Sequence, residues 1–286
     1  MKAKEISSAR AILTIFGGVF ILVFAQIVSG LAFDLPLPTG IASVIFGLAY
    51  VALSYLLIRL YCRLILAMET EDCAIGKPSI PLPWLVWAFL LPVAVSALLL
   101  CCPGELSKNQ LSTAEAINLI LNRLAVVGLG AGVVEEMVFR GLIMKTLEKR
   151  WGKLCAIIFP SIIFGLIHTL GNEMNIIDCV QLLIAGTGVG IMFSLIVYES
   201  GSIWASAVVH GLWNIIMIGP FLQIGTDHTK DVLFSYKLAT KSTLITGGAF
   251  GVEASIFAII GYSVGILWAF YLSKKKKQGG KQPVLP

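Results

Sequence analysis

The residues best suited to chemistry in this 286-residue chain are a few polar side chains set within long apolar runs. Glu135 and Glu136 are adjacent, and Arg140 lies four residues after Glu136. At that spacing on a helix, Glu136 and Arg140 share a face and can neutralise each other. Glu135 points about 100° away on the same helix. We therefore expect Glu136 to be structural and Glu135 to be free for chemistry.

Three further polar side chains lie in later apolar segments. Phe164 and His168 are four residues apart, and so are His210 and Asn214. Ionisable groups within a membrane segment generally face a partner or a cavity. Glu135 could then take a proton from a water molecule that His168 positions, and His168 could pass a proton to a leaving amine. His210 and Asn214 could donate hydrogen bonds to the developing oxyanion.

The composition indicates which elements must hold these residues. Hydrophobic residues make up 57% of the chain and charged residues 13%, with a mean hydropathy of +0.90. Soluble domains are about one-quarter charged, so a soluble enzyme, a disordered chain and a nucleic-acid binder are excluded. We predict an all-α polytopic transmembrane bundle of about eight spans. The expected helices are Ala11–Leu31, Ile41–Leu60, Trp84–Leu100, Leu119–Met144, Ala156–Leu170, Val180–Tyr198, Ile203–Leu222 and Val252–Leu272.

The candidate residues lie at similar depths in these helices. Measured from the cytoplasmic helix ends and at 1.5 Å per residue, Glu135 is about 15 Å deep, His168 about 18 Å and Asn214 about 17 Å. His210 is somewhat shallower, at about 10 Å. Three helices that run in alternating directions therefore bring polar groups to about the same layer, which indicates one site rather than scattered packing residues.

The distribution of positive charge predicts the orientation. Sixteen of the 21 Lys and Arg residues fall at one set of helix ends, including Lys2, Lys4, Lys274–Lys277 and Lys281. Cytoplasmic loops carry the excess of Lys and Arg, so we expect both termini in the cytoplasm. We divide the chain into residues 1–116, with three helices; residues 117–222, the core with helices four to seven; and residues 223–286, with an outer loop, the last helix and the basic tail.

The three motifs together resemble a known family. Glu-Glu-x-x-x-Arg, Phe-x-x-x-His and His-x-x-x-Asn, in this order on successive helices, resemble the CPBP family of CAAX proteases and bacteriocin-processing enzymes. The resemblance covers roughly Ile117 to Leu222. It implies an eight-helix intramembrane glutamic endopeptidase in a bacterial cell membrane, with a role in bacteriocin processing or immunity among those it suggests.

The resemblance also implies a role for each motif residue. Glu135 would be the base and His168 its partner, while His210 and Asn214 would stabilise the oxyanion. The supporting residues would be Glu136, Arg140 and Phe164. No cofactor or metal is expected; the expected partners are membrane lipids and a peptide or membrane-protein substrate, lipidated or not, and no nucleic acid.

Other functions are compatible with these residues. Glu135, His168 and His210 are acceptable zinc ligands for a zinc-dependent membrane protease. The same groups could relay protons in a transporter, or the bundle could be a non-catalytic immunity protein that acts by binding. Two smaller features have structural interpretations: Gly186, Gly188 and Gly190 permit close helix packing, and Glu253 is expected to interact with the dipole of the last helix.

Overall fold

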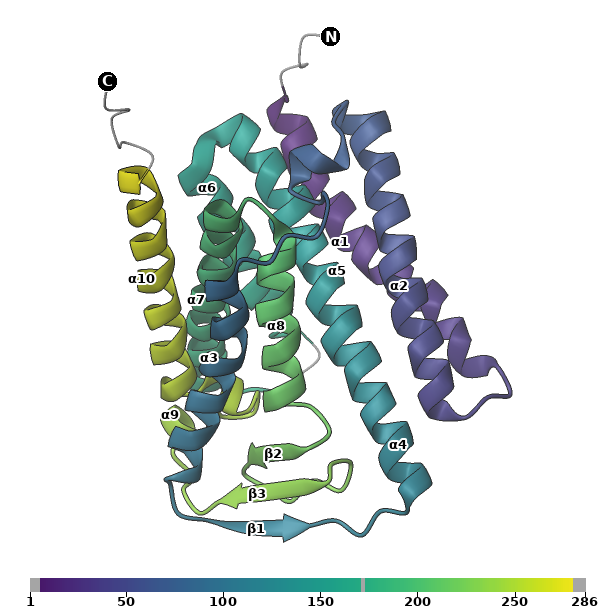
Figure 1. Cartoon of the computed structure of the whole chain (residues 1–286), viewed down its shortest axis with the longest axis vertical. Helices are drawn as coiled ribbons and strands as arrows, with labels where there is room; N and C mark the ends of the chain where they lie inside the picture. Colours follow the sequence, from purple (N-terminus) through teal and green to yellow (C-terminus); the bar gives the residue numbers. More distant parts are fainter. Residues whose placement is uncertain (1–5, 171–172, 280–286) are drawn as a thin grey trace.

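The computed structural model describes residues 6–170 and 173–279. Lys2, Lys4 and Lys281, which we used to predict the orientation, lie outside the described residues. It is a helix bundle with a small sheet at one end (Figure 1). The N-terminal part contains α1 (Ser8–Gly30), η1 (Leu31–Asp34), α2 (Thr39–Tyr61), η2 (Cys62–Leu66), η3 (Thr70–Cys73) and α3 (Leu82–Leu100). After β1 (Gly104–Lys108), one long helical segment contains α4 (Thr113–Asn122), η4 (Arg123–Ala131), α5 (Gly132–Glu136), η5 (Met137–Ile143) and α6 (Met144–Ile167).

The C-terminal part completes the bundle and the sheet. It contains α7 (Ile176–Ser200), α8 (Ile203–Met217), β2 (Leu222–Gly225), β3 (Phe234–Leu238), α9 (Thr243–Thr246), η6 (Val252–Ala254) and α10 (Ile256–Gly279). In Figure 1 the start of α1 and the end of α10 lie at the end of the molecule opposite the sheet.

The helices are long and apolar enough to cross a membrane. Six segments of the described chain, each with at least 19 residues, meet this criterion, and the shorter α8 is also apolar. About 20 residues are needed to cross a hydrocarbon core. Large apolar side chains such as Phe16 and Leu154 face outward, as expected against lipid. The chain is a multi-pass integral membrane protein, and the predicted all-α bundle is confirmed; the exact number of spans and the side of the termini stay predictions.

The segment Thr113–Ile167 changes direction at Gly152. Its 55 residues are too many for one crossing. Gly152 has φ +82° and ψ 173°, which is not a helical conformation. Glycine adopts such a positive φ more readily than other residues do. The helical ribbon turns at the end of the bundle away from the sheet (Figure 1). Glu135 and His168 therefore lie on two different rods, as the predicted helices Leu119–Met144 and Ala156–Leu170 require.

Close helix crossings occur where glycines meet. A methyl group added at Gly186 of α7 would lie 2.7 Å from Gly165 Cα of α6, and one at Gly190 would lie 2.8 Å from Ser161 Cβ. No atom lies within 4 Å of the corresponding position at Gly188. Two of the three glycines therefore act as predicted, because a small residue lets two membrane helices approach.

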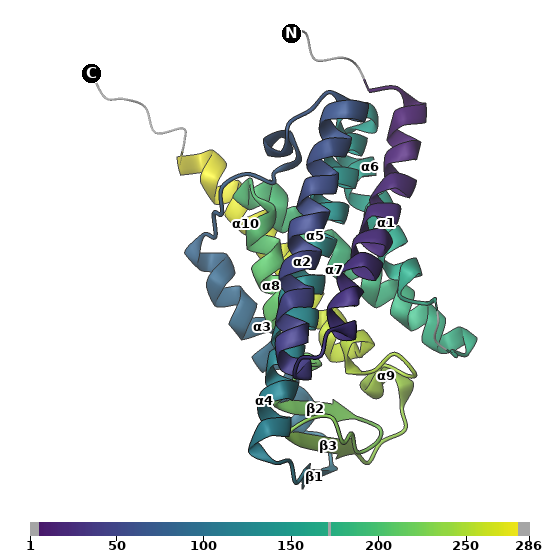
Figure 2. The ribbon, with the colours of Figure 1, turned by 90° about the vertical axis from the view of Figure 1, so that its right-hand side faces the viewer.

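The described chain also contains a sheet that the sequence analysis did not predict. Its order is β1-β3-β2, with β1 antiparallel and β2 parallel to β3. Figure 2 shows the sheet across one end of the bundle, below α8. β3, and β2 apart from its first residue, lie in the segment 223–251 that we expected to be an outer loop. The helix expected to reach Leu222 ends at Met217, and the last helix begins at Ile256 rather than Val252. The strands are short, of four or five residues, so their periodicity is a weak signal.

Candidate active site

The predicted site residues meet at one cavity inside the bundle. The cavity has a volume of about 190 Å³, and its walls include Glu135 of α5, His168 at the end of α6, and His210 and Asn214 of α8. Phe164 and Phe193 contribute aromatic rings to the same wall. The four residues that we expected to act together thus line one cavity, although they come from three helices.

A glycine pair brings α5 against α8. A methyl group added at Gly132 would lie 2.7 Å from Gly211 Cα. Gly132 precedes Glu135 by three residues, and Gly211 follows His210 directly. The close approach of these two backbones therefore places Glu135 beside His210, with 3.9 Å between Glu135 Oε2 and His210 Nε2. That distance is longer than a direct hydrogen bond and leaves room for a bridging water.

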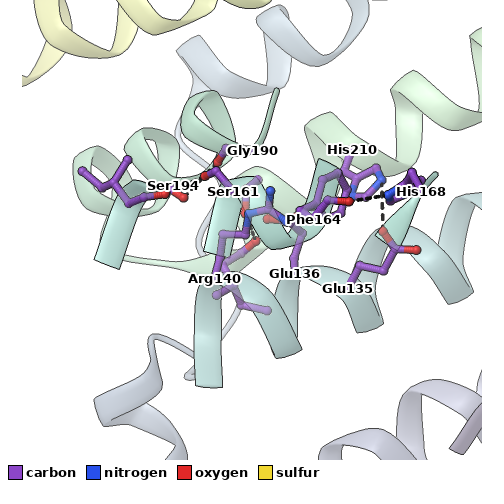
Figure 3. Close-up of polar contacts among 12 residues, drawn as sticks. Glu135, Glu136, Arg140, Ser161, Phe164, His168, Gly190, Ser194 and His210 are labelled. Atoms are coloured by element: carbon purple, nitrogen blue, oxygen red, sulfur yellow. Dashed lines mark hydrogen bonds and ion pairs between the residues drawn. The ribbon is translucent and has the colours of Figure 1, made fainter. Parts of the chain in front are cut away.

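Glu136 connects the two helices by an ion pair with Arg140 and a hydrogen bond with His210. Its Oε1 lies 3.1 Å from Arg140 Nη1 and 3.1 Å from His210 Nδ1 (Figure 3). A carboxylate only accepts hydrogen bonds, so Nδ1–H of His210 is the donor and Nε2 is turned toward Glu135. Glu136 and Arg140 are both completely buried. The expected pairing of Glu136 with Arg140 is present, and His210 is an additional partner that the spacing did not predict.

Aromatic rings surround the Arg140 guanidinium. Its Cζ lies 4.4 Å from the centre of the Phe164 ring and 5.2 Å from that of Phe193. The faces of aromatic rings attract cations, most strongly when water is excluded. The supporting position of Phe164 thus has a physical basis, because it packs on both Arg140 and the His168 ring, whose centre is 4.6 Å away.

His168 is oriented by its own helix. Its Nδ1 lies 2.7 Å from the backbone oxygen of Phe164. A carbonyl oxygen only accepts hydrogen bonds, so Nδ1 carries a proton, and in that tautomer of the imidazole Nε2 is the acceptor. An acceptor nitrogen at the wall of the cavity suits a role in holding a water O–H.

Asn214 is held against the irregular helix η4. Its Nδ2 donates to the backbone oxygen of Val127 at 3.1 Å. Val127 lies in a π-helical stretch, and such stretches frequently occur at functional sites. An amide nitrogen has two N–H groups, so the second remains to donate to a group in the cavity.

Three residues at the cavity were not among the predicted site residues. Glu253, Phe250 and Trp213 also line the cavity. Trp213 Nε1 donates to Glu253 Oε1 at 2.8 Å, and the Phe250 ring packs edge-on at 6.0 Å from the His168 ring. Glu253 faces the cavity, a position that the expected interaction with the last helix did not predict. A signal was present, since Glu253 is an acidic residue between apolar segments, but its loop gave no spacing that links it to the motifs.

Two residues of α7 hold this loop in place through three hydrogen bonds. Gln181 Nε2 donates to the backbone oxygens of Thr243 and Ala254, at 2.8 and 2.9 Å. Asp178 Oδ2 accepts from the backbone N–H of Ala249 at 3.3 Å. The segment that carries Phe250 and Glu253 is thus fixed at both ends.

The family comparison agrees with the motif analysis. Residues 117–216 match the family model described as Rce1-like, type II CAAX prenyl endopeptidase Rce1-like. We call these residues the Rce1-like segment, because they are similar to that family. The resemblance to the CAAX protease family is therefore confirmed. No curated protein and no solved structure matches the chain.

The Rce1-like segment covers about one-third of the chain and includes all seven motif residues. It ends before β2, so the sheet, the loop with Glu253 and α10 lie outside it. Among residues 6–170 and 173–279, no three His, Cys, Asp or Glu side chains are grouped so that they could hold a metal ion.

Proposed function

We propose that this protein is an intramembrane endopeptidase in which Glu135 activates a water molecule for attack on a peptide bond. The observation that carries the proposal is the shared cavity of Glu135, His168, His210 and Asn214. Glu135 Oε2 is buried and has no hydrogen-bond partner among the described residues. A buried carboxylate oxygen without a partner is costly, and a water between Glu135 and His210 Nε2 would satisfy it.

The proposed reaction uses each group once. Glu135 removes a proton from the water while His168 Nε2 holds the same molecule as an acceptor. The water oxygen forms a bond to the carbonyl carbon, and the resulting oxyanion accepts hydrogen bonds from Asn214 Nδ2–H and from Nε2–H of protonated His210. The C–N bond then breaks, and the departing nitrogen takes up a proton. Glu136 and Arg140 keep His210 and its helix in position.

The substrate class follows from the family description. We propose a peptide with a prenylated cysteine near the scissile bond, because the matching family model is described as a CAAX prenyl endopeptidase. The apolar surface of the bundle agrees with a substrate that is held in lipid by its prenyl group. Processing of a bacteriocin or peptide pheromone, in a bacterial membrane, stays a hypothesis from the motif resemblance.

The decisive experiment replaces Glu135 by Gln in the purified full-length chain. The probe is a fluorogenic peptide with a farnesylated Cys followed by three residues, and the same peptide without the farnesyl group is tested in parallel. Because the amide cannot act as a base, we expect the turnover of E135Q to fall by about 10²–10⁴-fold. The matched control is E105Q, at an exposed glutamate of β1, which should retain activity.

Several outcomes would contradict the proposal. Full activity of E135Q would exclude Glu135 as the base. Loss of wild-type activity on chelation, with recovery on addition of zinc, would establish the zinc-dependent alternative. If neither probe is cleaved, peptides from cells that carry the native chain are compared with those from E135Q cells, and the absence of any differing cleavage product would argue for a protein that acts by binding.

A further inference from the structure

Glu253 places a third carboxyl group close to the reacting groups, beyond Glu135 and Glu136. It lines the same cavity as Glu135 and both histidines, although it comes from η6 rather than from a motif helix. It lies outside the Rce1-like segment, so the family match assigns it no role. Its position is defined by the Trp213 Nε1 hydrogen bond to Oε1 and by the bond from the Tyr262 hydroxyl to its backbone oxygen at 2.9 Å.

The reaction proposed above requires a proton donor that has not yet been identified. Amide nitrogen is a poor leaving group unless it is protonated as the C–N bond breaks. The sequence analysis gave this proton to His168. In the structure, however, the Nδ1–H of His168 is directed at the Phe164 carbonyl oxygen. A His168 that holds the attacking water as an acceptor at Nε2 has no proton at that nitrogen to give, so another group must protonate the leaving nitrogen.

We propose that Glu253 is a catalytic residue of this site, the general acid that protonates the nitrogen of the scissile peptide bond. This inference rests on the proposed function. The carboxylic acid gives its proton to the nitrogen as the C–N bond breaks, and Glu135 holds the proton taken from water. Transfer of the proton from Glu135 to Glu253 restores the starting state of both groups. Water and peptide are consumed, and one carboxyl and one amino group are formed.

The surroundings of Glu253 favour a protonated carboxyl group. Burial raises the pKa of Glu253 above its ordinary value, and the charge of Glu135 acts in the same direction. The Trp213 N–H opposes this rise, as do His168 and His210 when they are protonated. Tyr262 of α10 donates to the Glu253 backbone rather than to its carboxyl group. An acid with a raised pKa still carries its proton at pH values where an ordinary glutamate has lost it.

Two variants separate catalysis from structural support. Glu253→Gln keeps the size of the side chain and an oxygen that accepts from Trp213, but it has no acidic proton. Trp213→Phe removes the hydrogen bond and keeps the acid. We expect E253Q to lower kcat for the farnesylated peptide by about 10²-fold or more with little change in KM. W213F should lower kcat by less than tenfold.

The leaving group and the pH profile test the chemical role. A farnesylated nitrophenyl ester with the same acyl group needs no protonation of its leaving group, so E253Q should cleave it nearly as fast as the wild type. The alkaline limb of the kcat profile, where Glu253 loses its proton, should be absent in E253Q. It should move to higher pH in W213F, because a donor that stabilises the carboxylate has been removed.

Equal losses on peptide and ester, or a larger loss in W213F than in E253Q, would overturn the assignment of Glu253. If E253Q does not fold, the pH profile of kcat for W213F provides the test. An alkaline limb that stays in place or moves to lower pH would then contradict the assignment of Glu253. E135Q keeps the two proposals distinguishable. Active E135Q contradicts the proposed function itself, whereas inactive E135Q with fully active E253Q contradicts the role of Glu253 alone.

Discussion

Glu135 and Glu136 are adjacent in sequence but have different surroundings. The Glu136 side chain is 0% exposed and contacts Arg140 and His210, whereas the Glu135 side chain is 20% exposed and faces the cavity. Two ionised groups in an apolar interior are tolerated when each has a partner. Because Glu136 is paired with Arg140, these buried charges are tolerated in the bundle. Glu135 is not part of that pair and is available for chemistry at the cavity.

At this scale we predict that Glu136→Gln destabilises the protein. The substitution leaves Arg140 as a buried cation without its carboxylate, which typically costs about 3–5 kcal/mol of the unfolding free energy. Unfolding in detergent, followed by circular dichroism, measures the loss. E135Q is the matched control and should unfold nearly as the wild type does. Equal stability of the two variants would show that the Glu136–Arg140 pair does not support the fold.

At the scale of elements, pairs of small residues determine where the functional side chains meet. Gly132 against Gly211 brings α5 to α8, and Gly165 against Gly186 brings α6 to α7. Gly165 precedes His168 by three residues. A change in either crossing distance would therefore move a functional group relative to the others, without altering any residue that touches the reacting atoms.

We predict opposite effects for two alanine substitutions on α7. In G186A the added methyl group would collide with Gly165, and overpacking of this kind costs about 1–3 kcal/mol. In G188A the methyl group meets no atom within 4 Å, and alanine is the better helix former by about 1 kcal/mol. The melting temperature and the rate of peptide cleavage should both fall in G186A, and both should be unchanged or higher in G188A. Equal behaviour of the two variants would contradict the close crossing.

At the scale of the whole molecule, the two ends of the bundle differ: one end carries the sheet, and the other carries the start of α1 and the basic end of α10. The basic residues Lys274–Lys277 lie at the end of α10 that is opposite the sheet in Figure 1. The start of α1 lies at that same end. An even number of crossings is consistent with this arrangement, and the excess of Lys and Arg predicts that this end is cytoplasmic.

Reporter fusions test this orientation in bacterial cells. A green fluorescent protein fused to the C-terminus should fluoresce, because it folds in the cytoplasm. Alkaline phosphatase inserted at residues 227–230, between β2 and β3, should be active, because it requires the oxidising side of the membrane. The reverse pattern would contradict the orientation predicted from charge.

The sequence by itself determined the all-α membrane bundle and the candidate residues of the Glu135, His168 and His210 motifs. Hydropathy and helical spacing are local properties, so they can be interpreted without knowing how helices pack. The packing of the helices brings His210 Nε2 to 3.9 Å from Glu135 Oε2, lets Glu136 join two helices, and places Glu253 at the same cavity. These relations depend on helix crossings and on a loop anchored by Gln181, and such contacts between distant parts of the chain leave no periodic pattern in the sequence.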